Sequence, residues 1–210
     1  MIFSDRKEAG ELLLTKLESF KKLKNLLVIA IPRGGVIIGK VVANKLKVPL
    51  DIIVIKKIGA PYNQELAIGA VGPKNSVFWD NDLIRKLNLN KTQLAELKNQ
   101  KIKERNEREY ILRQTKKPLM LKNKTVILVD DGVATGSTVL CAQKYLKKQK
   151  VKILILAAPV IAKETYTQIR TFFDRIITLN IQGSFYAVGQ FYRNFPQITD
   201  EEVVSILNSK

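Results

Sequence analysis

Residues 126–138 read Val-Ile-Leu-Val-Asp-Asp-Gly-Val-Ala-Thr-Gly-Ser-Thr, and this stretch decides the fold. Four apolar residues predict a buried strand, which runs into two acids and then into a loop of small and hydroxyl residues that opens a helix. Carboxylates can bind the hydroxyls of a sugar, and backbone amides at the start of a helix bind a phosphate. The sequence therefore predicts a site for a phosphorylated sugar, with the phosphate held by Thr135, Gly136, Ser137 and Thr138.

A simpler interpretation is that Asp131 caps the helix, while Gly132 and Gly136 only turn the chain. The length of the pattern favours the site over this alternative. The whole stretch resembles the phosphoribosyl-pyrophosphate (PRPP) signature of type I phosphoribosyltransferases, which has four apolar residues, two acids, a short loop and then Thr-Gly-Ser-Thr.

The resemblance implies a role for each position of the stretch. Asp130 and Asp131 would hold the ribose hydroxyls, in part through Mg²⁺, which they would contact largely through PRPP and water. The loop of Gly132, Val133 and Ala134 to Thr138 would hold the 5′-phosphate. Members that act on oxopurines usually carry an acid in mid-loop, whereas this chain has Ala134 there. Hypoxanthine and guanine are therefore disfavoured as acceptors.

A second motif, Ile-Pro-Arg-Gly-Gly-Val at residues 31–36, follows the predicted strand Leu26–Ile31. Arg33 can pair with two oxygens of a pyrophosphate, and Gly34 and Gly35 allow its close approach to the backbone. A purely structural turn is the alternative. In type I phosphoribosyltransferases the pyrophosphate loop occupies this position, which favours the binding role.

Lys56 and Lys57 end another predicted strand, Leu50–Ile55. Successive side chains of a strand face opposite ways, so only one of the two is expected to point into the site. The resemblance favours Lys57. It thus implies Arg33, Lys57 and Asp131 as catalytic residues, with Arg33 and Lys57 neutralising the departing pyrophosphate.

The resemblance extends along the chain to a small group of predicted bacterial phosphoribosyltransferases of unassigned substrate. It rests on residues 55–61, 65–71 and 187–203. In type I members, residues 59–71 correspond to a mobile loop, where Glu65 either orients substrate or caps local backbone. Residues 183–187 correspond to a hood, where Phe185 or Tyr186 either stacks on the acceptor base or belongs to the core.

Alternation of apolar strands with amphipathic helices predicts a doubly wound α/β fold, with a mainly parallel sheet and helices on both faces. We expect one domain over residues 1–210. Residues 59–117 would form a flexible loop, a hairpin and a polar helical excursion, and residues 183–208 the hood and a closing helix. Ligands of such folds bind beyond the carboxyl ends of the strands, where all three motifs lie. Further strands are predicted at 125–129, 151–157 and 176–179, and helices at 5–22, 36–46, 139–148 and 163–172.

Composition limits the possible classes of protein. The chain has one cysteine, Cys141, and no histidine, so an internal disulfide and a Ser-His or Cys-His catalytic device are excluded. No apolar run reaches the length of a membrane span, and a reducing cytoplasm is the expected location. The net charge of +17 suits an anionic substrate and equally suits nucleic acid, although 27 of the 36 basic residues are Lys.

The resemblance implies a Mg²⁺-dependent, homodimeric phosphoribosyltransferase that transfers the phosphoribosyl group of PRPP to a nitrogen nucleophile. The acceptor, a nucleobase or a related amine, is not identified by the sequence. The alternative is a PRPP-sensing regulatory module that binds nucleic acid through a basic surface, for which Lys91–Lys117 is the candidate stretch. Hydrolysis of a nucleotide or of PRPP on the same fold is a third possibility.

Overall fold

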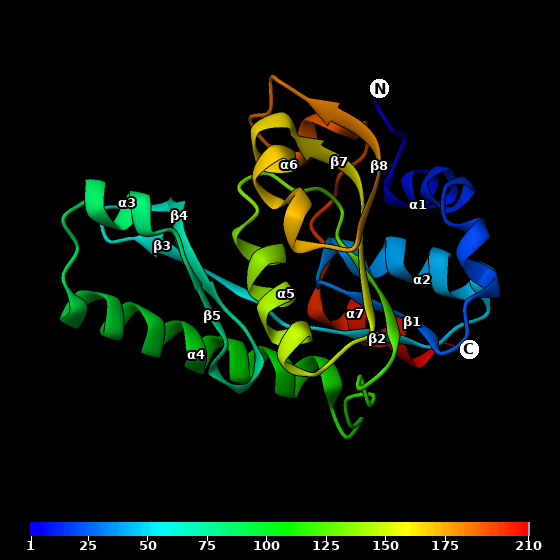
Figure 1. The fold of residues 1–210 in the computed structure, drawn as a ribbon, viewed down its shortest axis with the longest axis horizontal. Coiled ribbons are helices and arrows are strands. Elements are labelled where there is room, and N and C mark those ends of the chain that lie inside the picture. The colour runs from blue at the N-terminus through cyan, green and yellow to red at the C-terminus, as the bar shows by residue number, and fades with distance from the viewer. Residues whose placement is uncertain (210) are drawn as a thin grey trace.

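The computed structural model describes residues 1–209 and contains two β-sheets (Figure 1). The larger sheet has five parallel strands in the order β2-β1-β6-β7-β8. This arrangement confirms the predicted parallel α/β architecture. The strands are β1 (Leu26–Ala30), β2 (Leu50–Ile52), β6 (Thr125–Val129), β7 (Ile153–Ala162) and β8 (Arg175–Gln182).

Helices cover both faces of the large sheet because alternate strand residues point to opposite sides. Leu27, Ile29 and Val126 belong to the core cluster that packs under α5 and α6. Leu26 and Val28 belong to a second cluster under α1 and α2. The helices are α1 (Arg6–Thr15), α2 (Gly34–Leu46), α5 (Ser137–Lys148) and α6 (Lys163–Ile169), and short 3₁₀ turns follow α1 (Glu18–Lys22) and α6 (Arg170–Phe172).

The smaller sheet is antiparallel and lies to one side of the large one (Figure 1). A turn at Pro73–Asn75 joins β4 to β5, as the hairpin signal predicted. The apolar face of this sheet packs against a long polar helix, α4, which was also predicted. Its elements are β3 (Lys56–Ala60), β4 (Asn63–Val71), β5 (Val77–Trp79), α3 (Asn81–Lys86) and α4 (Lys91–Arg113).

One local prediction differs from the structure. The predicted strand Leu50–Ile55 ends at Ile52, and Lys56 and Lys57 begin β3 of the second sheet instead of ending a strand of the first. Residues 59–71, which correspond to a mobile loop in type I members, lie mainly in the antiparallel strands β3 and β4. From Ile52 to Ala60 the sequence is apolar apart from Lys56 and Lys57, so no turn signal marks where the chain leaves one sheet and enters the next.

The C-terminal segment returns to the large sheet. A 3₁₀ turn (Val188–Phe191) follows the predicted hood, and the chain ends in α7 (Asp200–Asn208). The Thr199 hydroxyl accepts from the Glu202 amide at 3.1 Å, and the Glu202 carboxylate accepts from the Thr199 amide at 2.7 Å. These reciprocal hydrogen bonds form a capping box, and α7 is the predicted closing helix. In residues 1–209, no helix combines the length and apolar character needed to cross a membrane.

Candidate functional site

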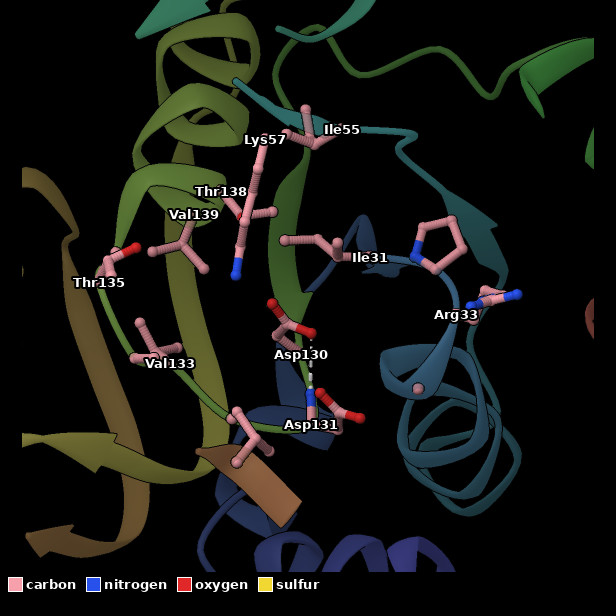
Figure 2. Close-up of a pocket in the computed structure, with 16 residues that line it drawn as sticks. Ile31, Arg33, Ile55, Lys57, Asp130, Asp131, Val133, Thr135, Thr138 and Val139 are labelled. Carbon is pink, nitrogen blue, oxygen red and sulfur yellow. Dashed lines mark hydrogen bonds between the residues drawn. The ribbon is translucent and has the colours of Figure 1, made fainter. Parts of the chain in front are cut away.

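A cavity of about 230 Å³ lies at the carboxyl ends of β1 and β6 (Figure 2). The loops that follow these neighbouring strands form two of its walls, and residues from the start of the second sheet form a third. The predicted motifs thus converge although they are far apart in sequence. The lining residues are Ile31, Pro32, Arg33, Gly34, Ile55, Lys57, Asp130, Asp131, Gly132, Val133, Ala134, Thr135, Gly136, Thr138, Val139 and Val188.

The two acids of the signature point in different directions. Asp130 is directed toward the Lys57 ammonium group, whereas the Asp131 carboxylate is turned toward the loop after β1 (Figure 2). The Asp131 amide donates to Asp130 Oδ1 at 2.9 Å. Burial raises the pKa of the Asp130 carboxyl well above its usual range, and the neighbouring Asp131 charge adds to this rise. A cation or hydroxyl donors from a ligand would stabilise the Asp130 carboxylate.

The loop between β6 and α5 offers unpaired backbone donors. In the described part of the chain, the amides of residues 134–139 donate to no protein acceptor, and the N-terminus of α5 has no side-chain cap. Gly136 has a φ of +78°, a conformation that favours glycine. The Thr165 hydroxyl donates to the Ala134 carbonyl and anchors the loop from α6. Free amides at the start of a twelve-residue helix form an anion-binding site.

The loop after β1 lies directly against the acids, because it carries two glycines. A Cβ atom on Gly35 would lie 2.9 Å from the Val129 carbonyl oxygen and 3.0 Å from Asp130 Cα. A Cβ atom on Gly34 would overlap the Asp131 carboxylate. The peptide bond between Pro32 and Arg33 in this loop is cis. Close contact between the two loops therefore requires glycine at both positions.

Arg33 belongs to the cavity wall through its backbone, but its guanidinium points away from Asp130 and Lys57 (Figure 2). The Gln197 side-chain amide lies against the guanidinium, and with its oxygen assigned to that side it accepts from Nη2 at 2.6 Å and from Nη1 at 3.3 Å. A pyrophosphate in the cavity would have to draw Arg33 away from Gln197. The sequence contained no signal for this contact.

The structure separates the roles of the two adjacent lysines. Lys57 lines the cavity and its ammonium group faces the Asp130 carboxylate (Figure 2). The Lys56 ammonium group lies 3.7 Å from the Glu104 carboxylate on α4. Alternation along β3 therefore directs Lys57 to the cavity and Lys56 to the polar helix.

The candidates from the loop and hood segments lie away from the cavity. Glu65 is exposed on the outer half of β4. Tyr186 is 91% exposed, and Phe185 packs on Phe191 with ring centroids 4.9 Å apart. From this segment it is Val188 that lines the cavity, where it contacts the position of Gly132. An aliphatic residue after a loop gave no functional signal in the sequence.

Arg6 is the principal site neighbour that the sequence analysis missed. Its Nε lies 2.8 Å from Asp131 Oδ2, and the two side chains are only 7% and 15% exposed. A signal was present, because Arg6 shares the buried face of α1 with Ala9, Gly10 and Leu13. A charged residue on a buried helix face requires a partner of opposite charge.

The donor set of the cavity suits a hard cation that is held largely by its ligand. In residues 1–209, no group of three or more acidic, Cys or His side chains could form a protein cage for a metal. Mg²⁺ usually keeps several waters and is bound by one or two carboxylates together with substrate phosphates. The Asp130 carboxylate beside a loop of unpaired backbone amides fits this mode of binding.

Comparisons with known proteins agree with this geometry. Residues 5–195 match the family described as the phosphoribosyl transferase domain. A provisionally named phosphoribosyl transferase of Mycobacterium tuberculosis strain H37Rv is 32% identical over 207 residues, and its counterpart in strain CDC 1551 gives the same values. The match covers 99% of this chain and 46% of each relative, so the chain spans about half the length of these proteins.

Solved structures share the fold. The crystal structure of TT1426 from Thermus thermophilus has a TM-score of 0.82 and 31% identity, covering 99% of this chain and 98% of that one. Purine phosphoribosyltransferase from Pyrococcus horikoshii has a TM-score of 0.50 and 18% identity over 92% of each chain, a likeness of fold alone. With the signature acids, free loop amides and basic side chain around one cavity, these matches show that the chain belongs to the phosphoribosyltransferase family.

Proposed function

We propose that this protein binds PRPP in the cavity and transfers its phosphoribosyl group to a nitrogen nucleophile, with release of pyrophosphate. One observation carries the proposal: the cavity is lined by the loop whose amides at residues 134–139 are unpaired and by Lys57, whose ammonium group faces the Asp130 carboxylate. This arrangement provides groups for the 5′-phosphate, the pyrophosphate and the ribose of one ligand. Family membership supports the same reaction class.

In this reaction the bond from the anomeric carbon to the pyrophosphate oxygen breaks, and a bond from that carbon to nitrogen forms. Positive charge develops on the ribose ring, so the protein acts chiefly by positioning the reactants and by stabilising charge. Asp130 would accept hydrogen bonds from the ribose hydroxyls. Lys57, together with Arg33 once it has turned from Gln197, would neutralise the leaving pyrophosphate.

Mg²⁺ would be held by the Asp130 and Asp131 side of the cavity, largely through PRPP and water, and would supply charge neutralisation to the leaving group. The acceptor would be a nucleobase or a related amine. Ala134 in mid-loop disfavours an oxopurine. Homodimer formation, a cytoplasmic location and mobility of the β3–β4 hairpin stay predictions.

Calorimetric titration of PRPP with Mg²⁺ tests the proposal, with Asp130→Asn and Lys57→Met as site variants. Lys56→Met is the matched control, because Lys56 pairs with Glu104 on α4 and does not line the cavity. We expect saturable binding that both site variants weaken at least tenfold and the control leaves within twofold. Pyrophosphate release with a panel of nucleobases and amines then identifies the acceptor. Absence of binding to the wild type at millimolar PRPP would contradict the proposal.

A second candidate function, a PRPP-sensing module that binds nucleic acid, is favoured by the distribution of charge. The segments that enter the five parallel strands carry fourteen of the 36 basic residues and one of the 19 acidic residues. Two of these segments meet directly, because the Lys124 ammonium group donates to Asn25 Oδ1 at 3.3 Å. The segments are residues 21–25, 45–49, 114–124, 147–152 and 170–174.

This basic edge shares only residues 114–117 with Lys91–Lys117, the stretch that the sequence suggested. Along α4 several of the cations are paired, since Glu104 contacts Lys101 and Glu109 contacts both Arg105 and Arg113. Binding of a duplex oligonucleotide at several salt concentrations tests the candidate. PRPP-dependent binding that falls steeply with salt, and that Lys122→Glu/Lys124→Glu weakens, would support it. Equal weakening by Lys91→Glu/Lys98→Glu on α4 would contradict the assignment to this edge.

A further inference from the structure

The buried contact between Arg6 and Asp131 distinguishes the two acids of the signature. Arg6 Nε donates to Asp131 Oδ2 at 2.8 Å, and Arg6 Nη1 donates to the Pro196 carbonyl at 2.9 Å. The guanidinium also lies 3.7 Å above the centre of the Phe195 ring. With a hydrogen bond to a carboxylate, one to a carbonyl and an aromatic face, Arg6 is fixed on several sides and nearly excluded from solvent.

The same aromatic segment holds the backbone of Asp131. The Tyr192 hydroxyl donates to the Asp131 carbonyl at 2.6 Å, and the Tyr192 ring stacks on Phe195 at a centroid distance of 4.9 Å. Asp131 is therefore held at its side chain by the first helix and at its backbone by the C-terminal segment. Gly34 packs against the same carboxylate oxygen from the loop after β1.

Asp130 has none of these protein partners. In the described residues its carboxylate accepts only from the amide of Asp131, and it faces Lys57 across the cavity. A ligand that enters the cavity meets an acid with free acceptor capacity at Asp130. At Asp131 it meets a carboxylate whose charge is already compensated by a guanidinium.

We propose that Arg6 is a positioning residue that holds the Asp131 carboxylate turned away from the ligand, so that Asp130 is the acid that contacts the ribose. This inference rests on the proposed function and departs from the equal roles that the resemblance implies for the two acids. Arg6 acts through Asp131 and does not touch the substrate. Without Arg6, an uncompensated carboxylate would stand beside the sites for the phosphate and the pyrophosphate and would repel both.

A double-mutant cycle separates the two assignments. We would measure PRPP affinity by calorimetry, and unfolding by heat, for Arg6→Met, Asp131→Asn and the double variant, together with Asp130→Asn and Arg6→Lys. We expect Arg6→Met to weaken PRPP binding at least tenfold and the double variant to bind more tightly than Arg6→Met, because the uncompensated charge is gone. Arg6→Lys should bind more tightly than Arg6→Met, since it restores a cation. Asp130→Asn should cost at least tenfold more affinity than Asp131→Asn.

Arg113 provides the matched control. It forms an ion pair of the same kind with Asp51, at 2.7 Å and with both side chains 11% exposed, on the edge strand β2, and neither residue lines the cavity. Arg113→Met should lower the unfolding temperature as Arg6→Met does, but leave PRPP affinity within twofold. A purely structural role of Arg6 would make the two variants behave alike, which would overturn the inference.

The remaining outcomes are distinguishable. If the wild type binds PRPP and Asp131→Asn costs as much affinity as Asp130→Asn, or if the double variant binds more weakly than Arg6→Met, the division between the acids is wrong and the proposed function stands. If the wild type does not bind PRPP, the proposed function fails and the inference fails with it. The comparison of the two Asn variants does not depend on Arg6→Met being folded.

Discussion

Gly34→Ala is the substitution whose effect the structure defines most sharply. A Cβ atom at this position would lie 2.5 Å from Asp131 Cγ and 2.7 Å from Arg6 Nε, and closer still to Asp131 Oδ2. Ordinary contacts of a carbon atom begin near 3.4 Å, so Asp131 Cγ has to withdraw by about 1 Å and Oδ2 by about 1.7 Å. The methyl group therefore occupies the position in which Asp131 meets Arg6, and their hydrogen bond at 2.8 Å is lost.

The expected cost follows from the burial of this pair. Breaking a buried ion pair costs about 3–5 kcal/mol of unfolding free energy, because the charges remain without full solvation. Replacing Gly by Ala at the start of α2 returns up to about 1 kcal/mol through the lower entropy of the unfolded chain. We therefore expect Gly34→Ala to destabilise the protein by about 2–4 kcal/mol. For a chain of this size that is a fall in Tm of about 5–15 °C.

Thermal and urea unfolding measure this loss, and Gly183→Ala is the control. Gly183 lies in the exposed loop after β8, where an added Cβ atom would meet no atom within 4 Å. We expect the free energy of unfolding of this control to lie within about 0.5 kcal/mol of the wild-type value. If Gly34→Ala were as stable as Gly183→Ala, the close contact between the two loops, and the buried pair beneath it, would be refuted.

Three further predictions concern other parts of the molecule. Gly136→Ala should cost about 1–2 kcal/mol and weaken binding of ribose 5-phosphate in calorimetry, because Gly136 has a φ of +78° and an added Cβ would lie 2.8 Å from Thr165 Cγ2. Burial raises the pKa of the Cys141 thiol to about 11, so the thiol stays protonated at pH 8. We therefore expect it to react with a disulfide reagent about a hundredfold more slowly in the native protein than in urea. Equal rates in the two conditions would contradict its burial. Thr199→Ala removes the cap of α7 and should lower the free energy of unfolding, measured in urea, by about 1 kcal/mol. The control is Ser205→Ala, because Ser205 is exposed and its hydroxyl forms no cap.

The large sheet could be predicted because its strands are short apolar runs separated by amphipathic helices. Strand β6 (Thr125–Val129) is buried at every position, which is why the apolar run before Asp130 identified it. The second sheet was harder to predict. From Ile52 to Ala60 the sequence is apolar apart from Lys56 and Lys57, so no local signal separates a parallel strand from the antiparallel strand that follows it.

The contacts within the site could not be predicted from sequence spacing. Arg6 and Asp131 are 125 positions apart, and their meeting depends on how α1 packs across the end of the large sheet. The same holds for Arg33 and Gln197, which meet only because the C-terminal segment crosses the loop after β1. The signature identifies groups that face a ligand, whereas long-range packing decides which of them are free to bind it.

Helix α5 supports two walls of the cavity at once. Its N-terminus continues the loop with the free amides, and its middle packs against the second sheet. There, Cys141 Sγ lies 3.7 Å from the Ser76 carbonyl oxygen, and the Lys144 ammonium group lies 3.5 Å from the Val77 carbonyl oxygen. That sheet begins with the strand that carries Lys57. A displacement of α5 would therefore move the phosphate-binding loop and Lys57 together relative to Asp130, because Asp130 follows β6 in the large sheet. The second sheet therefore supports the site, because its first strand carries the basic group that lines the cavity.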